Sequence, residues 1–176
     1  MSDLLKPSKC FLFCSCLYNQ EAALVSFDKI FEGRFGPSIK FTHEFFPMKD
    51  FYAKEMGEAI HLKRVIYLST QLFDREQIVT EKLWATHLEN VNLKNGKRTL
   101  NIDVGTISLE NLILATGKNF VHRIYLSDGV FADLNLIFSD NIFKPLPWTY
   151  PDYAHVDFIA FFTWARSLLL TILKNT

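Results

Sequence analysis

The order of strand-like and helix-like segments is the feature that most constrains the fold of this chain. Short apolar runs of strand length alternate with two segments of helical periodicity, which Asn19 and Asp74 can cap. The expected elements are a strand at 9–18, a helix after Asn19, strands at 38–46 and 61–69, a helix from Asp74 to about Asn90 and a strand at 98–104. Their order, β-α-β-β-α-β, is typical of the ferredoxin-like split βαβ fold.

Three further strands are expected after this pattern, near 109–115, 121–126 and 130–138. Residues 47–57 are expected to form a polar and aromatic loop. At 176 residues the chain fits one domain, and no repeat, low-complexity segment or linker divides it. We therefore predict a single α+β domain over residues 1–176, in which a ferredoxin-like split βαβ start is extended by additional antiparallel strands and a C-terminal helix.

The C-terminal segment 156–173 is strongly apolar, which raises the question of a membrane span. Asp157 and Arg166 interrupt it, whereas a spanning helix needs about 20 apolar residues with few charges. Its apolar residues from Phe158 to Ile172 follow helical spacing instead. We predict an amphipathic helix packed on the sheet and no membrane span, with a helix on a membrane surface as the alternative.

Three cysteines lie close together, at positions 10, 14 and 16. An odd number in one short segment is a poor disulfide framework and favours a reducing compartment, so we expect a cytoplasmic protein. Their spacing is not that of a zinc knuckle, and no histidine lies close by. Because free cysteine is often buried, a strand buried on both faces is the preferred interpretation, with a metal site as the alternative.

The charge balance excludes several classes of function. Lys plus Arg and Asp plus Glu both number 19, so the formal net charge is zero. Bulk electrostatic binding of nucleic acid is therefore not expected.

The chain also has no P-loop, no G-x-G-x-x-G, no H-E-x-x-H and no G-x-S-x-G motif. The common signatures of nucleotide, zinc-protease and hydrolase sites are therefore absent from the sequence.

The hairpin around Asp128 and Gly129 can adopt two registers. A two-residue turn would place Ile124 opposite Asp133, whereas a three-residue loop from Ser127 to Gly129 would place Arg123 there. The second register gathers the apolar residues of 122–138 on one face, and a clean apolar face specifies register. We therefore expect a three-residue loop and a cross-strand ion pair between Arg123 and Asp133.

This register predicts a polar patch on one face of the sheet. If the strand at 98–104 adjoins the hairpin, Asn101 and Asp103 lie beside Arg123, Asp133 and Asn135. The catalytic candidates are Asp103, Asp133 and His122, and the ligand-binding candidates are Arg123, Lys118, Asn101, Arg98 and Tyr125.

The residue types of this patch point to a small anionic or polyhydroxylated ligand, which includes nucleotide-like molecules. Arg and Lys bind phosphate or carboxylate, and Asp103 and Asp133 are able to hold Mg²⁺ or act as general base. A solvated sheet face with one ion pair is the simpler interpretation. A partner-binding module without chemistry is the alternative function, with Phe51, Tyr52, Trp148 and Tyr150 as exposed anchors.

Several short motifs resemble a bacterial family known as domain of unknown function 4416. They include Tyr52 with Glu55-Met56-Gly57, Arg98 with Asn101, Asp103 and Gly105, Ala115-Thr116 with Lys118, His122 to Leu126, Gly129 with Ala132, and Trp148 to Tyr153. The resemblance extends from the first strand to the last helix, and it implies a bacterial, cytoplasmic protein.

The same resemblance adds Tyr52 and Glu55 to the candidate ligand-binding residues. Val104, Gly117 and Asp133 depart from the family pattern, where proline, a hydroxyl residue and glutamate are usual. Family members are sometimes labelled GTP-binding proteins, but the chain lacks the P-loop that such a label would suggest.

Overall fold

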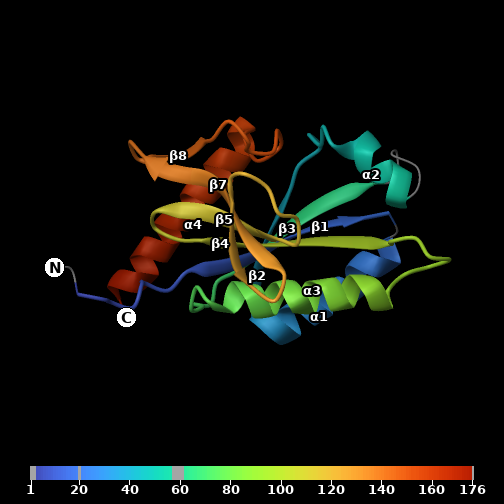
Figure 1. Cartoon of the computed structure of the whole chain (residues 1–176), viewed down its shortest axis with the longest axis horizontal. Helices are drawn as coiled ribbons and strands as arrows, with labels where there is room; N and C mark the ends of the chain where they lie inside the picture. Colours follow the sequence, from blue (N-terminus) through green and yellow to red (C-terminus); the bar gives the residue numbers. More distant parts are fainter. Residues whose placement is uncertain (1–2, 20, 57–61, 176) are drawn as a thin grey trace.

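A computed structural model describes residues 3–19, 21–56 and 62–175, although not the side chains of 21–26 (Figure 1). The elements are β1 Phe11–Tyr18, α1 Glu21–Phe35, β2 Ser38–Thr42, α2 Lys49–Met56, β3 Lys63–Ser69, α3 Gln77–Val91, β4 Leu100–Ile107, β5 Asn111–Thr116, β6 Arg123–Ser127, β7 Val130–Ser139, β8 Ile142–Pro145 and α4 Val156–Lys174.

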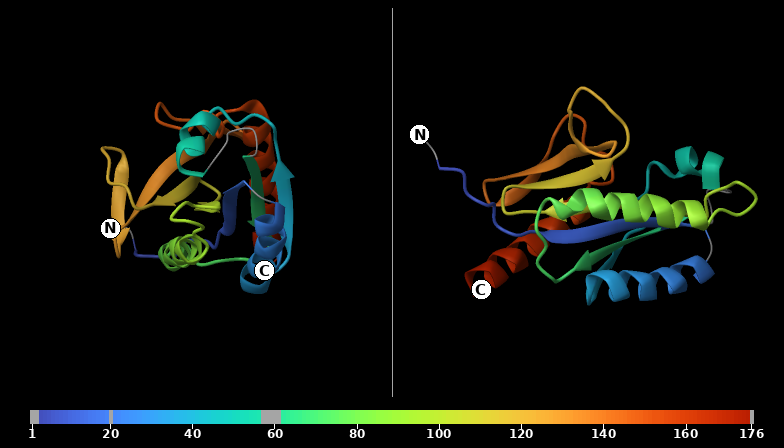
Figure 2. Two further views of the ribbon diagram at one scale, coloured as in Figure 1. Left: turned by 90° about the vertical axis from the view of Figure 1, so that its right-hand side faces the viewer. Right: turned by 60° about the horizontal axis from the view of Figure 1, so that its bottom comes forward.

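All strand pairs of the sheet are antiparallel, and the strand order is β2-β3-β1-β4-β5-β7-β6, with β8 also paired to β7. The first four strands in this order, with α1 and α3 as crossovers, form the ferredoxin-like arrangement. The later strands and α4 extend it, so the predicted α+β fold is confirmed. Figure 2 shows that the sheet curls around α3, with β2 and β3 on one side of this helix and β6 and β7 on the other.

Helices cover the sheet on both faces. Aromatic residues of α1, with Ile78 and Ala85 of α3, pack against one face, whereas α4 packs against the other. The central strand β1 is therefore buried along its whole length. Cys14 and Cys16 within β1 and Cys10 just before it are free and buried, which confirms the doubly buried strand.

The helix α4 buries Phe158, Phe162, Ala165 and Leu169 against the sheet. Asp157 lies in its first turn and Lys174 in its last, as the helix dipole favours. The predicted amphipathic helix packed on a sheet is confirmed. By length and composition alone, α4 is also apolar enough to cross a membrane.

Two segments differ from the prediction. The expected loop at 47–57 contains the helix α2, which packs Met56 and Tyr52 against Leu17 of β1 and so gains stability from tertiary contacts. The strand β8 was also missed, because its four residues lie in a proline-containing segment.

The hairpin between β6 and β7 has the expected register, since Arg123 pairs with Asp133. The predicted three-residue loop is wrong. Ser127 pairs with Val130, and Asp128 and Gly129 both have positive φ, as a two-residue type I′ turn requires. Between Tyr125 and Ser127 the strand β6 contains one extra residue, Leu126, which has no partner in β7. Such an extra residue shifts every following pair by one, so Arg123 still faces Asp133 despite the shorter turn.

A second bulge changes the faces of β7. Ile113 pairs with Leu134 and Leu112 with Leu136, so Asn135 is the extra residue. Val130 consequently belongs to the core under α3, whereas Leu136 belongs to the core under α4. The single apolar face predicted for this strand is therefore wrong, because the bulge reverses the side on which later side chains lie.

Candidate functional site

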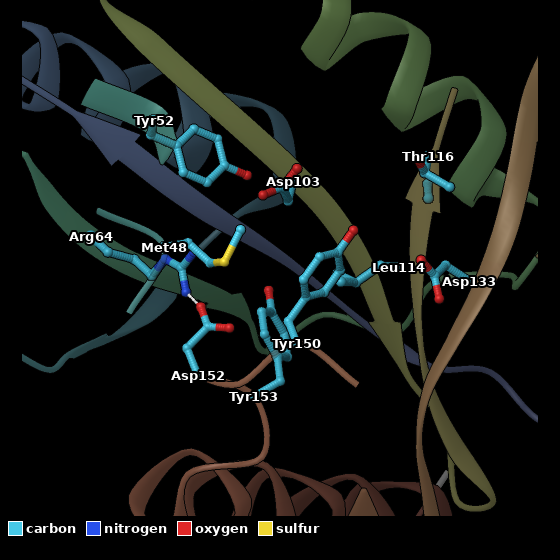
Figure 3. A pocket seen from close by; sticks show the side chains of 11 residues that line it. Met48, Tyr52, Arg64, Asp103, Leu114, Thr116, Asp133, Tyr150, Asp152 and Tyr153 are labelled. Carbon is cyan, nitrogen blue, oxygen red and sulfur yellow. Dashed lines mark ion pairs between the residues drawn. The ribbon is translucent and has the colours of Figure 1, made fainter. Parts of the chain in front are cut away.

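A cavity of about 50 Å³ lies on the α4 face of the sheet (Figure 3). Three predicted residues line it: Tyr52 of α2, Asp103 of β4 and Asp133 of β7. The other lining residues were not among the candidate site residues, and they are Met48, Arg64, Leu114, Ala115, Thr116, Tyr150, Asp152 and Tyr153. The cavity is thus built from strands and from two segments, around α2 and before α4, that are distant in sequence.

Asp133 is buried and has three polar neighbours. Arg123 Nε donates to its Oδ2 over 2.8 Å, and Asn135 Nδ2 donates to its Oδ1 over 3.1 Å. His122 Nε2 lies 3.4 Å from the same Oδ1. The ion pair predicted from the hairpin register is therefore present, but inside the protein rather than on a solvated face, because these side chains are 11% and 3% exposed.

Arg123 uses all three of its guanidinium nitrogens within the protein. Besides Asp133, it donates to the backbone oxygen of Lys118 over 3.0 Å and to the hydroxyl of Tyr150 over 3.2 Å. Three of the five N–H donors of this guanidinium are thus used within the protein. Its structural role is to position the carboxylate of Asp133 and the ring of Tyr150.

Asp103 is bonded in a different way. Asn101 Nδ2 donates to its Oδ2 over 3.2 Å, and Arg98 Nη1 donates in turn to Asn101 Oδ1 over 3.2 Å. Among the described residues, no basic side chain lies within ion-pair distance of Asp103. Figure 3 shows Tyr52 and Asp103 pointing toward one another. Asp103 is thus a carboxylate at the cavity without a direct counter-charge.

Arg64 and Asp152 form a buried ion pair at the opposite side of the cavity (Figure 3). The guanidinium of Arg64 also lies over the ring of Phe46, at 4.3 Å from the ring centroid. Its Nε has no hydrogen-bond partner among the residues that the structure describes. A buried charged donor without an acceptor is costly, so this nitrogen is an unsatisfied group beside the cavity.

The tyrosine hydroxyls of the cavity remain protonated at neutral pH. Burial raises the pKa of Tyr52, and the charge of Asp103 raises it further. Burial is also the main cause of the raised pKa of Tyr150 and of Tyr153. Each of these side chains therefore offers a hydroxyl that can donate a hydrogen bond.

Other predicted site residues lie outside the cavity lining. Lys118, Tyr125 and Glu55 are exposed, and Tyr125 contacts the ring of Phe131 instead. Arg98 reaches the site only through Asn101. The catalytic candidate His122 is stacked on the ring of Trp148 at 4.8 Å and lies beside the cavity rather than in its lining.

Among the described residues, Asp103 and Asp133 are not part of a group of three histidine, cysteine or carboxylate side chains able to hold one ion, so Mg²⁺ at these two residues stays a prediction. The one such group in the described part of the chain lies elsewhere and contains neither aspartate. The cavity therefore offers hydrogen-bonding groups rather than a ready set of Mg²⁺ ligands.

Two missed residues had a detectable signal in the sequence. Asp152 is a lone charge in an aromatic segment, whereas Arg64 follows Lys63 at the start of β3, just before an apolar run. Their opposite signs are compatible with a pair. Sequence spacing did not reveal that they meet, because they belong to distant segments.

Comparison with known proteins identifies a family but no activity. The family model described as domain of unknown function (DUF4416) matches residues 8–168. No curated protein and no solved structure matches the chain at a significant level.

Proposed function

The chain belongs to the family described as domain of unknown function (DUF4416), and we propose that it binds a small hydroxylated anion in the cavity beside Asp103. Hydroxy acids, sugar acids and sugar phosphates have this chemistry. The proposal narrows the anionic or nucleotide-like ligand expected from the sequence.

The observation that supports this proposal is that, within the described part of the chain, an unsatisfied hydrogen-bond donor and an acceptor without a basic partner belong to residues that line the same cavity. Arg64 Nε has no acceptor, and Asp103 has no direct basic partner among the described residues. An anionic oxygen would satisfy the first, and a hydroxyl group would donate to the second. The protonated hydroxyl of Tyr52 supplies a further donor.

The size of the cavity limits the part of the ligand that is enclosed. One water molecule needs about 10–15 Å³ of such volume. A cavity of about 50 Å³ therefore encloses a group of carboxylate or phosphate size with a few neighbouring atoms. A complete nucleotide would leave its base and ribose outside.

The proposal concerns binding, and any reaction would involve Asp103. No basic side chain of the described residues lies within ion-pair distance of its carboxylate, so it is available to accept a proton from a ligand hydroxyl. Asp133 is less available, since Arg123 and Asn135 already engage it. We also propose a reducing, cytoplasmic location in a bacterium, which remains a prediction from the cysteines and the family resemblance.

The experiment is a thermal stability assay with hydroxy acids, sugar phosphates, inorganic phosphate, nucleotides and Mg²⁺. A ligand at 100 times its dissociation constant adds about 2.7 kcal/mol to stability. Asp103→Asn should abolish stabilisation by a hydroxylated anion, and Tyr52→Phe should weaken the affinity for that anion about tenfold through one lost hydrogen bond. Glu55→Gln, an exposed change on the same helix as Tyr52, should leave it intact.

Equal stabilisation of the parent protein and Asp103→Asn would contradict the proposed site. Failure of every compound to stabilise the parent protein would contradict the function itself.

A partner-binding module is the second candidate function, and exposed apolar side chains on β6 favour it. Ile124 is 70% and Tyr125 59% exposed on this edge strand. Of the predicted anchors, Phe51 and Trp148 are exposed, whereas Tyr52 and Tyr150 line the cavity. An Ile124→Lys variant that abolishes association with a cellular protein would support this function instead.

A further inference from the structure

A second group of chemically capable side chains lies outside the cavity. His43 follows β2, His155 is the N-cap of α4, and Asp157 lies in the first turn of that helix. One ligand atom from each of the three lies within 4.8 Å of the others. The fold therefore brings two imidazoles and a carboxylate together from segments far apart in the sequence.

The distances are close to those of a tetrahedral metal site. His43 Nε2 lies 2.8 Å and His155 Nδ1 3.5 Å from Asp157 Oδ2. Ligand atoms bound to Zn²⁺ at about 2.0–2.1 Å are separated from each other by about 3.3 Å in a tetrahedron. Small side-chain movements are thus enough to place an ion among the three.

Aromatic packing holds both histidines in place. The ring of His43 is stacked on Phe41 at 6.2 Å and meets Phe158 edge to face at 5.6 Å. The ring of His155 is stacked on Phe45 at 4.5 Å. Ligands that are already oriented lose little rotational freedom on binding, which favours affinity.

We infer that His43, His155 and Asp157 form a binding site for a divalent transition metal ion of the zinc type, with a coordination position open to solvent. Two imidazole ligands select zinc, cobalt or nickel over magnesium and calcium. Their side chains are 25%, 27% and 54% exposed, so water can reach the ion. Three protein ligands with a fourth position open is the arrangement of catalytic zinc sites.

The hydrogen bonds that the imidazoles of His43 and His155 accept from backbone N–H groups must change when an ion binds. The Asp157 backbone N–H donates to His155 Nδ1 over 3.3 Å, so this nitrogen is unprotonated, but an ion bound there takes the lone pair that now caps α4 and the Asp157 N–H must find water instead. The Phe45 N–H donates to His43 Nδ1 over 3.0 Å, which leaves the proton on Nε2. For Nε2 to bind an ion, this proton must move to Nδ1, and the Phe45 N–H then turns to water. Since Phe45 is exposed, water can replace the lost acceptor.

The N-terminus of α4 opposes a cation, because a helix start carries a partial positive charge. This effect changes affinity by about thirtyfold at most for a partly buried group, and the carboxylate of Asp157 acts against it. Direct bonds from two imidazoles and a carboxylate outweigh an effect of this size. His43 also borders a groove of about 570 Å³, which gives an external ligand access to its side of the site.

The test is a titration of the full chain, free of any polyhistidine tag, with Co²⁺ and Zn²⁺. Visible absorption of bound Co²⁺ reports tetrahedral coordination, and calorimetry measures Zn²⁺ affinity and stoichiometry. One ion per chain is expected. His43→Ala and Asp157→Asn should each weaken binding at least tenfold, whereas His87→Ala, an exposed histidine on α3, should leave it unchanged.

Stoichiometric binding that persists in His43→Ala, or the absence of saturable binding by the parent chain, would overturn the inference. Circular dichroism confirms that each variant is folded. If His43→Ala unfolds, Asp157→Asn decides, because this carboxylate is half exposed and its amide analogue can be accommodated.

Discussion

At the scale of single residues, Arg123 shows how burial changes the value of an ion pair. Its pair with Asp133 is almost fully excluded from solvent, whereas Arg75 and Glu110 form a pair that is 28% and 60% exposed. Removing one partner of a buried pair leaves an uncompensated charge and costs about 3–5 kcal/mol. An exposed pair contributes about 0–1 kcal/mol.

We therefore predict that Arg123→Ala lowers the free energy of unfolding by about 3 kcal/mol and Arg75→Ala by less than about 1 kcal/mol, as measured by urea denaturation. Adding Asp133→Asn to Arg123→Ala should recover part of the loss, because it removes the unpaired charge. Equal effects of the two arginine substitutions would show that the Asp133 pair is solvated.

Glu89 of α3 makes a contribution to the stability of the folded protein that depends on pH. It is buried beneath β4, where its Oε1 accepts a hydrogen bond from the Ile102 N–H over 2.5 Å, and burial raises its pKa. A raised pKa means that the folded state retains the proton to higher pH than the unfolded chain. The stability from this group is therefore complete below about pH 4.5 and is lost as pH rises through the raised pKa.

The variant Glu89→Gln should remove this loss, because an amide oxygen can still accept from Ile102 without a charge. We expect it to be more stable than the parent chain at neutral pH, with the difference shrinking toward pH 4. Denaturation at several pH values measures this, with the exposed Glu76→Gln as control. A difference that does not change with pH would contradict the assignment.

At the scale of elements, two glycines differ in whether the surrounding atoms leave room for a side chain. A Cβ at Gly105 of β4 would lie 2.4 Å from the ring of Phe13 and 2.8 Å from the Ile113 carbonyl oxygen. A Cβ at Gly33 in α1 would meet nothing within 4 Å. Both positions lack a positive φ, so only the surroundings differ.

Gly105→Ala should destabilise the protein by about 1–3 kcal/mol, because a well-packed core must move to admit the methyl group. Gly33→Ala should stabilise it by about 0.5–1 kcal/mol, because alanine is the better helix former. Thermal or urea denaturation of both variants measures the two signs. A neutral Gly105→Ala would show that β4 and Phe13 can separate at little cost.

The elements also show why part of the prediction succeeded. Long periodic segments such as α3 and the doubly buried β1 were identified, because a 3.6-residue or continuous apolar pattern survives in the sequence. The helix α2 and the short β8 were not, since each depends on contacts with distant segments. The bulge at Asn135 left no sequence signal that separates it from a regular strand.

At the scale of the whole molecule, β1 joins two cores. Phe31 belongs to the core beneath α1 and α3, and Phe162 to the core beneath α4, while alternate side chains of β1 enter both. Removing either ring costs about 3–5 kcal/mol. Because the cores share their central strand, neither should survive the loss of the other.

We therefore predict one unfolding transition for the parent chain, Phe31→Ala and Phe162→Ala, with each variant shifted to lower denaturant. Far-ultraviolet circular dichroism and tryptophan fluorescence should give coincident curves. Trp84 reports on the first core and Trp164 lies on α4, so two separate fluorescence transitions would contradict a single cooperative unit.

What the sequence alone determined is the fold class, the buried cysteine strand and the apolar face of α4. These features depend on periodicity and on side-chain alternation, which are local and therefore visible along the chain. Tertiary structure alone decided that the Arg123 pair is buried, that Arg64 and Asp152 complete the cavity, and that His43 meets His155 and Asp157. These contacts join segments that are distant in sequence, and only the curl of the sheet and the packing of α2 and α4 against it bring them together.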